Sequence, residues 1–96
     1  MVNIQVYNEE NKKIETVRCE ENETMRNVQK LEDKYGETQV EKIEKDTSKK
    51  TPMIRYYLST ETHRIIVSMT IFQAERVNDY LASYEAFAKV YNETET

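Results

Sequence analysis

Few side chains in this chain are of the types that carry out covalent or acid–base chemistry. The 96 residues include one cysteine, Cys19, and one histidine, His63, and no sequence motif joins them as a nucleophile and its base. A lone histidine without such partners is usually an ordinary surface residue. The single glycine excludes a glycine-rich phosphate-binding loop, and no set of Cys and His residues has the spacing of a zinc site.

The acidic residues do not indicate catalysis either. Carboxylates are abundant, but they lie in solvated runs such as Glu20-Glu21 and not on apolar segments where burial would shift a pKa. We therefore expect no enzymatic activity, no metal, no cofactor and no small-molecule substrate. The expected function is binding, through the shape and the charge of the surface.

The composition predicts one folded domain. Hydrophobic residues make up 38% of the chain and charged residues 33%, a polar but patterned composition that differs from that of a disordered chain. We assign residues 1–91 to a single domain and residues 92–96 to a polar tail. The longest apolar run is shorter than a membrane span, and a lone cysteine is typical of a reducing compartment. We therefore expect no membrane contact and a cytoplasmic location.

The N-terminal part of the chain predicts a hairpin followed by a helix. Residues 2–7 alternate apolar and polar side chains as in a half-buried strand, and residues 14–19 form a second strand that can pair with it. Asn22 or Thr24 can cap a helix that continues to about residue 35. The apolar stripe of this helix is formed by Met25, Val28, Leu31 and Tyr35, and Gly36 follows where helices commonly end with a left-handed residue.

A second hairpin is expected in the middle of the chain. Residues 40–45 and 52–58 are strands separated by a polar, basic loop whose tip carries Lys49 and Lys50. A basic hairpin beside a helix is how a winged helix presents its wing to DNA phosphates. An equally acceptable interpretation is a solvated turn, in which the lysines oppose edge-to-edge pairing of strands.

The remaining elements complete the predicted fold. Residues 61–69 fit either a short helix or a continued strand, since the run Ile65-Ile66-Val67 is β-branched. Thr70 and Gln73 have the form of a capping box, so a helix is expected to start at Thr70 and to continue as far as Tyr91. The predicted class is α+β: an N-terminal β-hairpin, a helix, a second, wing-like β-hairpin, and C-terminal amphipathic helices packed on the strands.

The last predicted helix has an apolar seam with heptad spacing. The seam is formed by Val77, Leu81, Tyr84 and Tyr91. A homodimer through this seam is one interpretation, because sustained heptads favour packing between helices. Packing of the same stripe on the domain's own sheet is favoured roughly two to one, because three heptads are near the minimum for a coiled coil.

Charge is distributed unevenly along the chain. The formal net charge is −4, which disfavours a general nucleic-acid binder. Residues 42–55 contain five basic and two acidic residues, a local charge of +3, so the remainder of the chain carries −7. Both a basic and an acidic surface are therefore available to a macromolecular partner.

Several stretches share a pattern with one known family. Residues 46–59 combine a basic, polar hairpin with a Pro-x-Tyr-Leu-like strand, residues 65–69 are aliphatic, and the last predicted helix carries Ala74, Tyr80 and Phe87. In this order of elements, the segment 46–90 resembles the Rha family of phage regulatory proteins, which are of the antirepressor type. The resemblance implies a small phage or prophage regulator in the cytoplasm of a bacterial host.

The chain departs from this family in the part that recognises DNA. The family has a helix-turn-helix between its first hairpin and the helix that corresponds to the one holding Val28. Only Glu20, Glu21 and Asn22 stand there in this chain. Because three residues cannot form the first of these helices, the resemblance implies a fold that survives while DNA recognition is weakened or lost.

Two functional hypotheses follow, and their partners differ in charge. In the first, a regulator approaches DNA through basic residues of the first helix and the second hairpin, namely Arg26, Lys30, Lys49, Lys50 and Arg55. In the second, an inhibitor of the DNA-mimic or anti-CRISPR kind presents an acidic face to a host nucleic-acid-binding protein. The residues of that face are Glu9, Glu10, Glu20, Glu21, Glu23, Glu32, Asp33 and Glu37. The net charge favours a protein partner slightly over DNA, although acidic surfaces are common among soluble proteins.

Overall fold

The computed structural model describes residues 1–48 and 50–81, with the backbone alone for residues 77–81. The described elements, in chain order, are β1 (Val2–Tyr7), β2 (Lys13–Cys19), α1 (Thr24–Tyr35), β3 (Gln39–Asp46), β4 (Met53–Ser59), β5 (Arg64–Thr70) and α2 (Ile71–Leu81). One turn of 3-10 helix (Glu21–Glu23) leads into α1. The expected α+β class is confirmed. No helix among the described residues is long and apolar enough to cross a lipid bilayer.

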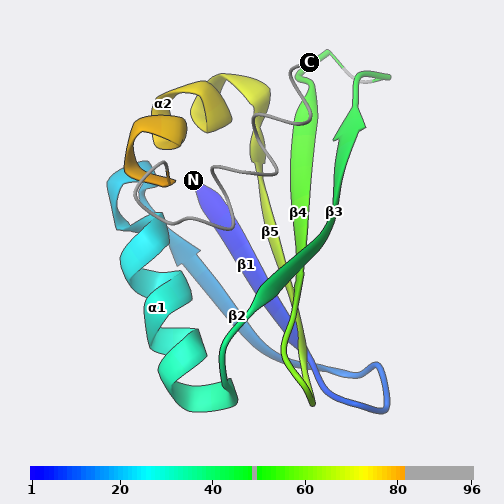
Figure 1. Cartoon of the computed structure of the whole chain (residues 1–96). Helices are drawn as coiled ribbons and strands as arrows, with labels where there is room; N and C mark the ends of the chain where they lie inside the picture. Colours follow the sequence, from blue (N-terminus) through cyan, green and yellow to red (C-terminus); the bar gives the residue numbers. More distant parts are fainter. Residues whose placement is uncertain (49, 82–96) are drawn as a thin grey trace.

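The five strands form one antiparallel sheet in the order β2-β1-β5-β4-β3 (Figure 1). The β1–β2 and β3–β4 hairpins expected from the sequence lie on either side of β5, which pairs with β1 and with β4. The register places Ile4 opposite Val67, and Val67 opposite Tyr56. The two hairpins are therefore joined into one sheet only through β5.

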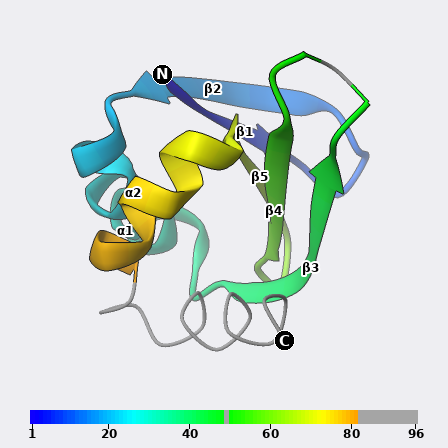
Figure 2. The same ribbon diagram turned by 90° about the horizontal axis from the view of Figure 1, so that it is seen from above.

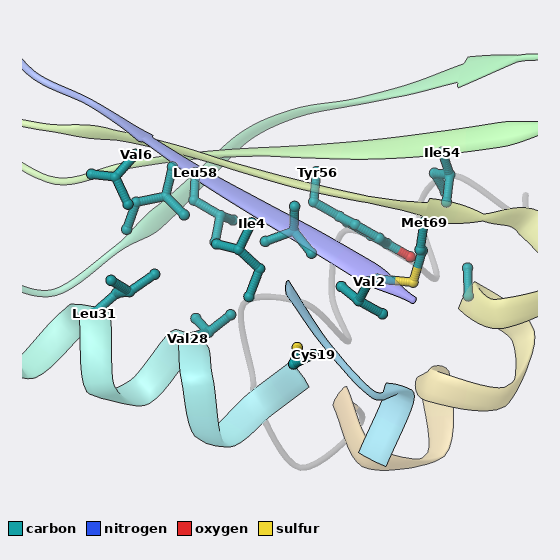
Figure 3. Packing of buried hydrophobic residues seen from close by; sticks show 13 residues of the cluster. Val2, Ile4, Val6, Cys19, Val28, Leu31, Ile54, Tyr56, Leu58 and Met69 are labelled. Carbon is teal, nitrogen blue, oxygen red and sulfur yellow. The ribbon is translucent and has the colours of Figure 1, made fainter. Parts of the chain in front are cut away.

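Both helices cover the same face of the sheet, which curves around them (Figure 2). The strands bury alternate side chains against the helices: Val2, Ile4 and Val6 of β1, Ile54, Tyr56 and Leu58 of β4, and Ile65, Val67 and Met69 of β5. The apolar stripe of α1 supplies Val28 and Leu31 to this layer (Figure 3), and α2 supplies Ala74. Burying one aliphatic side chain of this size stabilises a fold by about 1.5–3 kcal/mol, so this layer is the main source of folding free energy.

The segment after the second hairpin is strand β5, so for residues 61–69 the strand interpretation is confirmed and the short helix is wrong. Burial alternates strictly along β5, with Ile65 and Val67 fully buried and Ile66 half-buried between them. β-Branched side chains pack well on such a pleated surface, and the open edges of β1 and β4 offer ladder partners on both sides. The Thr60 hydroxyl accepts from the backbone N–H groups of Thr62 (3.2 Å) and His63 (2.9 Å), so it stabilises the β4–β5 turn and not a helix start.

Two helix boundaries lie where the sequence predicts them. The backbone N–H of Thr70 donates to Gln73 Oε1 at 2.9 Å, and the backbone N–H of Gln73 donates to Thr70 Oγ1 at 3.0 Å. This reciprocal pair confirms the capping box at the start of α2. Gly36 has a φ of +110° and its N–H donates to the carbonyl oxygen of Glu32 at 2.8 Å, which confirms the end of α1.

The start of α1 differs from the expectation. The helix begins at Thr24 with Glu23 at the N-cap, and no side chain forms a cap hydrogen bond there. Neither Asn22 nor Thr24 is the cap, because the chain enters α1 from the preceding 3-10 turn. In that turn the N–H of Glu23 donates to the carbonyl oxygen of Glu20 at 3.0 Å.

Replacement of Ile4 by alanine is expected to destabilise the fold by about 2–5 kcal/mol. Ile4 is fully buried on β1, opposite Val67 of β5, so its truncation leaves a cavity in the core. Ile14→Ala is the matched control, because Ile14 is 47% exposed and its truncation removes little packing. Urea unfolding monitored by circular dichroism measures both changes, and equal losses for the two variants would contradict the described sheet.

Candidate functional site

The possible nucleophile, Cys19, and the possible base, His63, lie at opposite ends of the sheet. Cys19 pairs with Val2 at one end of β1, whereas His63 precedes Arg64, which pairs with Tyr7 at the other end. Five residues of strand separate these positions, a distance of about 16 Å. Burial also raises the pKa of the Cys19 thiol. Cys19 and His63 therefore do not form a nucleophile–base pair.

His63 belongs to a cluster that attaches the end of α1 to the sheet. Its ring lies against the ring of Tyr35, with 4.3 Å between the centroids, and its Nδ1 is 2.7 Å from Thr62 Oγ1. The Tyr35 hydroxyl donates to Glu15 Oε2 at 2.7 Å, and Lys34 Nζ donates to the same oxygen at 3.2 Å. These contacts attach α1 to β2 and to the β4–β5 turn. His63 and Tyr35 therefore contribute to packing.

Two grooves adjoin this cluster on either side of the β4–β5 turn. The first has a volume of about 620 Å³ and lies between the turn and the end of α1, where Gly36 and Glu37 line it. The second, of about 310 Å³, lies between the turn and the β1–β2 loop. Hydroxyl groups and carboxylates dominate both linings. No group of described residues has the composition and spacing to hold a metal ion.

The face of the sheet opposite the helices carries the largest organised set of polar side chains. Its residues alternate with the buried ones along each strand, and none of them is buried. We call this surface the open face; it consists of Asn3, Gln5, Tyr7, Lys13, Thr16, Arg18, Gln39, Glu41, Lys42, Glu44, Asp46, Met53, Arg55, Tyr57, Ser59, Arg64, Ile66, Ser68 and Thr70.

The open face is basic although the protein is acidic. Five cationic residues come from four strands, namely Lys13, Arg18, Lys42, Arg55 and Arg64, against the carboxylates of Glu41, Glu44 and Asp46. The open face thus carries +2, while the net charge of the chain is −4. The fold therefore separates charge between the two faces of the sheet.

Three of the cationic residues differ in whether a carboxylate of the protein already forms an ion pair with them. Arg55 Nη1 donates to Glu44 Oε1 at 3.1 Å, and Lys42 Nζ lies 3.8 Å from the same carboxylate. Arg64, at the other end of β5, is exposed and forms no ion pair within residues 1–48 and 50–76. A positive charge without an internal partner is available to a ligand.

Aromatic rings lie among these cations. Lys42 Nζ is 4.5 Å from the ring centroid of Tyr57, a cation–π contact between β3 and β4. The Tyr7 hydroxyl donates to Gln5 Oε1 at 3.0 Å. Both rings are half-buried and so keep part of their surface accessible on the open face.

Asn3 is an exception to the rule that buried polar atoms are paired. It lies on β1 between Arg18 of β2 and Ser68 of β5, and its Oδ1 is buried without a hydrogen-bond partner among the described residues. An unpaired buried acceptor costs about 1–3 kcal/mol. Asparagine is also a poor strand former, so its position in the middle of the sheet reduces stability.

The basic residues predicted to contact DNA do not lie together. Arg26 and Lys30 are exposed on α1, which covers the helical face of the sheet, whereas Arg55 lies on the open face. Lys50 is exposed in the loop between β3 and β4, and Lys49 lies outside the described residues. Arg55 instead shares the open face with the other cations Lys13, Arg18, Lys42 and Arg64.

The predicted acidic residues are distributed over three places. Glu9 and Glu10 lie in the β1–β2 loop, Glu20, Glu21 and Glu23 precede or begin the helical layer, and Glu32, Asp33 and Glu37 are at the other end of α1. Three of them have internal partners. Glu10 Oε2 lies 3.5 Å from Lys12 Nζ. Glu21 Oε1 accepts from Arg76 at 2.7 Å, and Glu32 Oε2 accepts from the N–H and hydroxyl of Thr38, both at 3.0 Å.

The predicted dimer seam falls at the edge of what the structure describes. Val77 and Leu81 lie within the α2 helix, and Tyr84 and Tyr91 lie outside the described residues. The homodimer stays a prediction.

Most residues of the open face were not among the predicted site residues. Arg64 is far from Tyr7 and Arg18 in the sequence, and it joins them on one surface only because β5 pairs with β1. The available signal was the polar half of each alternating strand, where arginine and tyrosine recur opposite the buried positions.

We expect Asn3→Thr to stabilise the fold by about 1 kcal/mol. The substitution removes the unpaired acceptor and introduces a strand-forming residue. Gln5→Thr is the control on the same strand and face, because the amide of Gln5 is already paired with Tyr7. Thermal unfolding of the three proteins measures the difference, and a lower melting temperature for Asn3→Thr would contradict the reading.

Glu15→Gln is expected to destabilise the fold above about pH 5 and to have little effect at about pH 3. Hydrogen bonds from Tyr35 and Lys34 lower the pKa of Glu15 in the folded state. The resulting stabilisation is complete above the ordinary carboxyl value of about 4.3 and is lost as the pH falls through the folded-state value. Because Glu15 is partly exposed, the expected loss is below about 1 kcal/mol.

Urea unfolding at several pH values measures this dependence. Glu10→Gln is the control, because Glu10 forms only an exposed ion pair with Lys12 at 3.5 Å. The same destabilisation by Glu15→Gln at both ends of the pH range would exclude the proposed linkage.

Comparisons with known proteins identified no relative of this chain. A scan against protein-family models, a search of curated proteins and a search of solved structures each found no match.

Proposed function

We propose that the protein is a non-catalytic binding module that engages an anionic macromolecule through the open face. The observation that carries this proposal is the charge separation: the open face carries +2 in a chain of net charge −4. Random placement of charges would give an acidic face. A basic surface on an acidic protein concentrates the field where the partner docks and repels it elsewhere.

The open face is also suited to binding because its cations are held on a rigid support. Arg18, Arg55 and Arg64 all project from strands of one hydrogen-bonded sheet. Side chains on regular strands lose less freedom on binding than side chains on loops, so more of the contact energy remains as affinity. The absence of a nucleophile–base pair between Cys19 and His63 supports a binding function over a catalytic one.

A regulatory role of the phage type is a finer proposal. Its support is the β3–β4 hairpin, which carries the basic loop and the strand that resemble the Rha family. The aliphatic segment that corresponds to a helix in that family is strand β5 here, so the support is limited to the hairpin. A gel-shift experiment with genomic fragments at low salt tests this role, and no shift at any fragment concentration would exclude DNA as the target.

An inhibitor with an acidic face is the second candidate. It is favoured by the exposed carboxylates Glu20, Glu23, Asp33 and Glu37 on the helical side, since the chain outside the open face carries −6. Its partner would be a basic nucleic-acid-binding protein of the host. A pull-down from host lysate with the wild-type chain, and with these carboxylates changed to amides, tests this candidate. Equal recovery by both would count against it.

Heparin chromatography provides the direct test of the primary proposal. Arg18→Gln/Arg64→Gln removes two positive charges from the open face, and we expect this variant to elute at a lower salt concentration than the wild type. Arg26→Gln/Lys30→Gln is the matched control, because it removes the same charge from exposed positions on α1. The control is expected to elute close to the wild type.

Two results would overturn the proposal. One is passage of the wild-type protein through the column at low salt. The other is an equal shift for both double variants, since that would show an effect of net charge without preference for the open face.

A further inference from the structure

The cross-strand register arranges the open face in rows perpendicular to the strands. The central row runs Gln5, Ile66, Tyr57, Lys42 from β1 to β3. Neighbouring strands are about 4.8 Å apart, so this row spans about 14 Å. A row of this kind is a flat floor with an amide at one end, a cation at the other, and apolar and aromatic surface between them.

Cations occupy the rows on both sides of the aromatic floor. Arg55 lies two residues before Tyr57 on β4, and Arg64 lies two residues before Ile66, diagonal to Tyr57 on the neighbouring strand. Arg64 is also directly opposite Tyr7. Diagonal neighbours on a sheet are about 7–8 Å apart, within reach of long side chains. Each tyrosine therefore has at least one arginine beside it.

We propose that the anionic macromolecule is a single-stranded nucleic acid, whose bases stack on Tyr57 and Tyr7 while its phosphates contact Arg55 and Arg64. This inference rests on the proposed function of the open face. Alternating aromatic and cationic side chains are what a single strand requires, because its bases have exposed π-faces and its backbone is charged. The amide N–H groups of Gln5 supply neutral donors beside the stacking positions, since its Oε1 already accepts from Tyr7.

A duplex fits this surface less well than a single strand. Reading a duplex needs an element that enters a groove, whereas the open face is the broad side of a sheet. In a duplex the bases are stacked on each other, so rings on a flat surface cannot reach their faces. The stacking contribution of Tyr57 would then be lost.

An acidic protein fits it less well too. Protein interfaces have a fully buried apolar centre from which charged residues are depleted. Near the centre of the open face, Ile66 is the aliphatic residue, and the adjacent rows contain cations. Charge together with accessible rings is characteristic of nucleic-acid binding.

Fluorescence anisotropy with a labelled 12-nucleotide single strand, as DNA and as RNA, tests the inference at low salt. Stacking of one base is worth about 1–3 kcal/mol, so Tyr57→Leu is expected to weaken binding about 5- to 100-fold. Tyr57→Phe keeps the ring and is expected to bind within about threefold of the wild type. Phe72→Leu is the matched control, because Phe72 is an aromatic residue 61% exposed on α2, on the helical side.

A second measurement does not depend on the stability of the tyrosine variants. The logarithm of the binding constant falls with the logarithm of salt concentration by about 0.7 for each phosphate contact of a single strand. Arg64→Gln is therefore expected to reduce this slope by about 0.7, and Lys30→Gln on α1 to leave it unchanged. Equal slopes for wild type and Arg64→Gln would contradict the proposed contact between Arg64 and a phosphate of the single strand.

The remaining outcomes separate this inference from the proposed function. If the matching duplex binds more tightly than the single strand and Tyr57→Leu has no effect, the ligand is a duplex and the single-strand inference is wrong. Tighter binding of polyglutamate of equal length would indicate an acidic protein. Absence of oligonucleotide binding, together with heparin retention that depends on Arg18 and Arg64, would overturn the single-strand inference alone. Heparin retention that is independent of these arginines would overturn both.

Discussion

The pairing of β1 with β5 is the contact on which the other features depend. It places Ile4 opposite Val67 and so brings the apolar sides of both hairpins into one layer beneath the helices. The same pairing places Gln5 opposite Ile66 on the other side of the sheet. Because strand side chains alternate with a period of two, a register shift of one residue would exchange the core and the open face. Core packing and the composition of the binding surface are therefore fixed by one interaction.

Charge separation across the sheet follows from this geometry. The helical side carries the carboxylates at both ends of α1, and the open face carries arginines and lysines from different strands. Two of its five cations, Lys42 and Arg55, form ion pairs with Glu44. Exposed ion pairs contribute little to stability, so exchanging Glu44 for a ligand phosphate would cost the fold little. The proposed phosphate contacts therefore do not require a loss of structure.

Local signals in the sequence predicted much of the fold. Alternation gave β1, the Thr70–Gln73 capping box gave the start of α2, and Gly36 gave the end of α1. β5 was ambiguous because its β-branched run also satisfies helical spacing, and the deciding factor was the two unpaired strand edges beside it. No local pattern specifies that β1 pairs with a strand near residue 67. The open face therefore could not be assembled in advance, and the basic residues predicted on the first helix and on the second hairpin lie on different sides of the sheet.

The central position of β5 also has a consequence for biosynthesis. Each hairpin can close soon after its residues leave the ribosome, but β1 lacks its second neighbour until residues 64–70 have emerged. During most of translation the nascent chain exposes an apolar strand with a free edge, the kind of segment that pairs with other chains. Long-range strand pairing is also slow to form. The order of synthesis therefore leaves the edge of β1 open to pairing with other chains until β5 has been made.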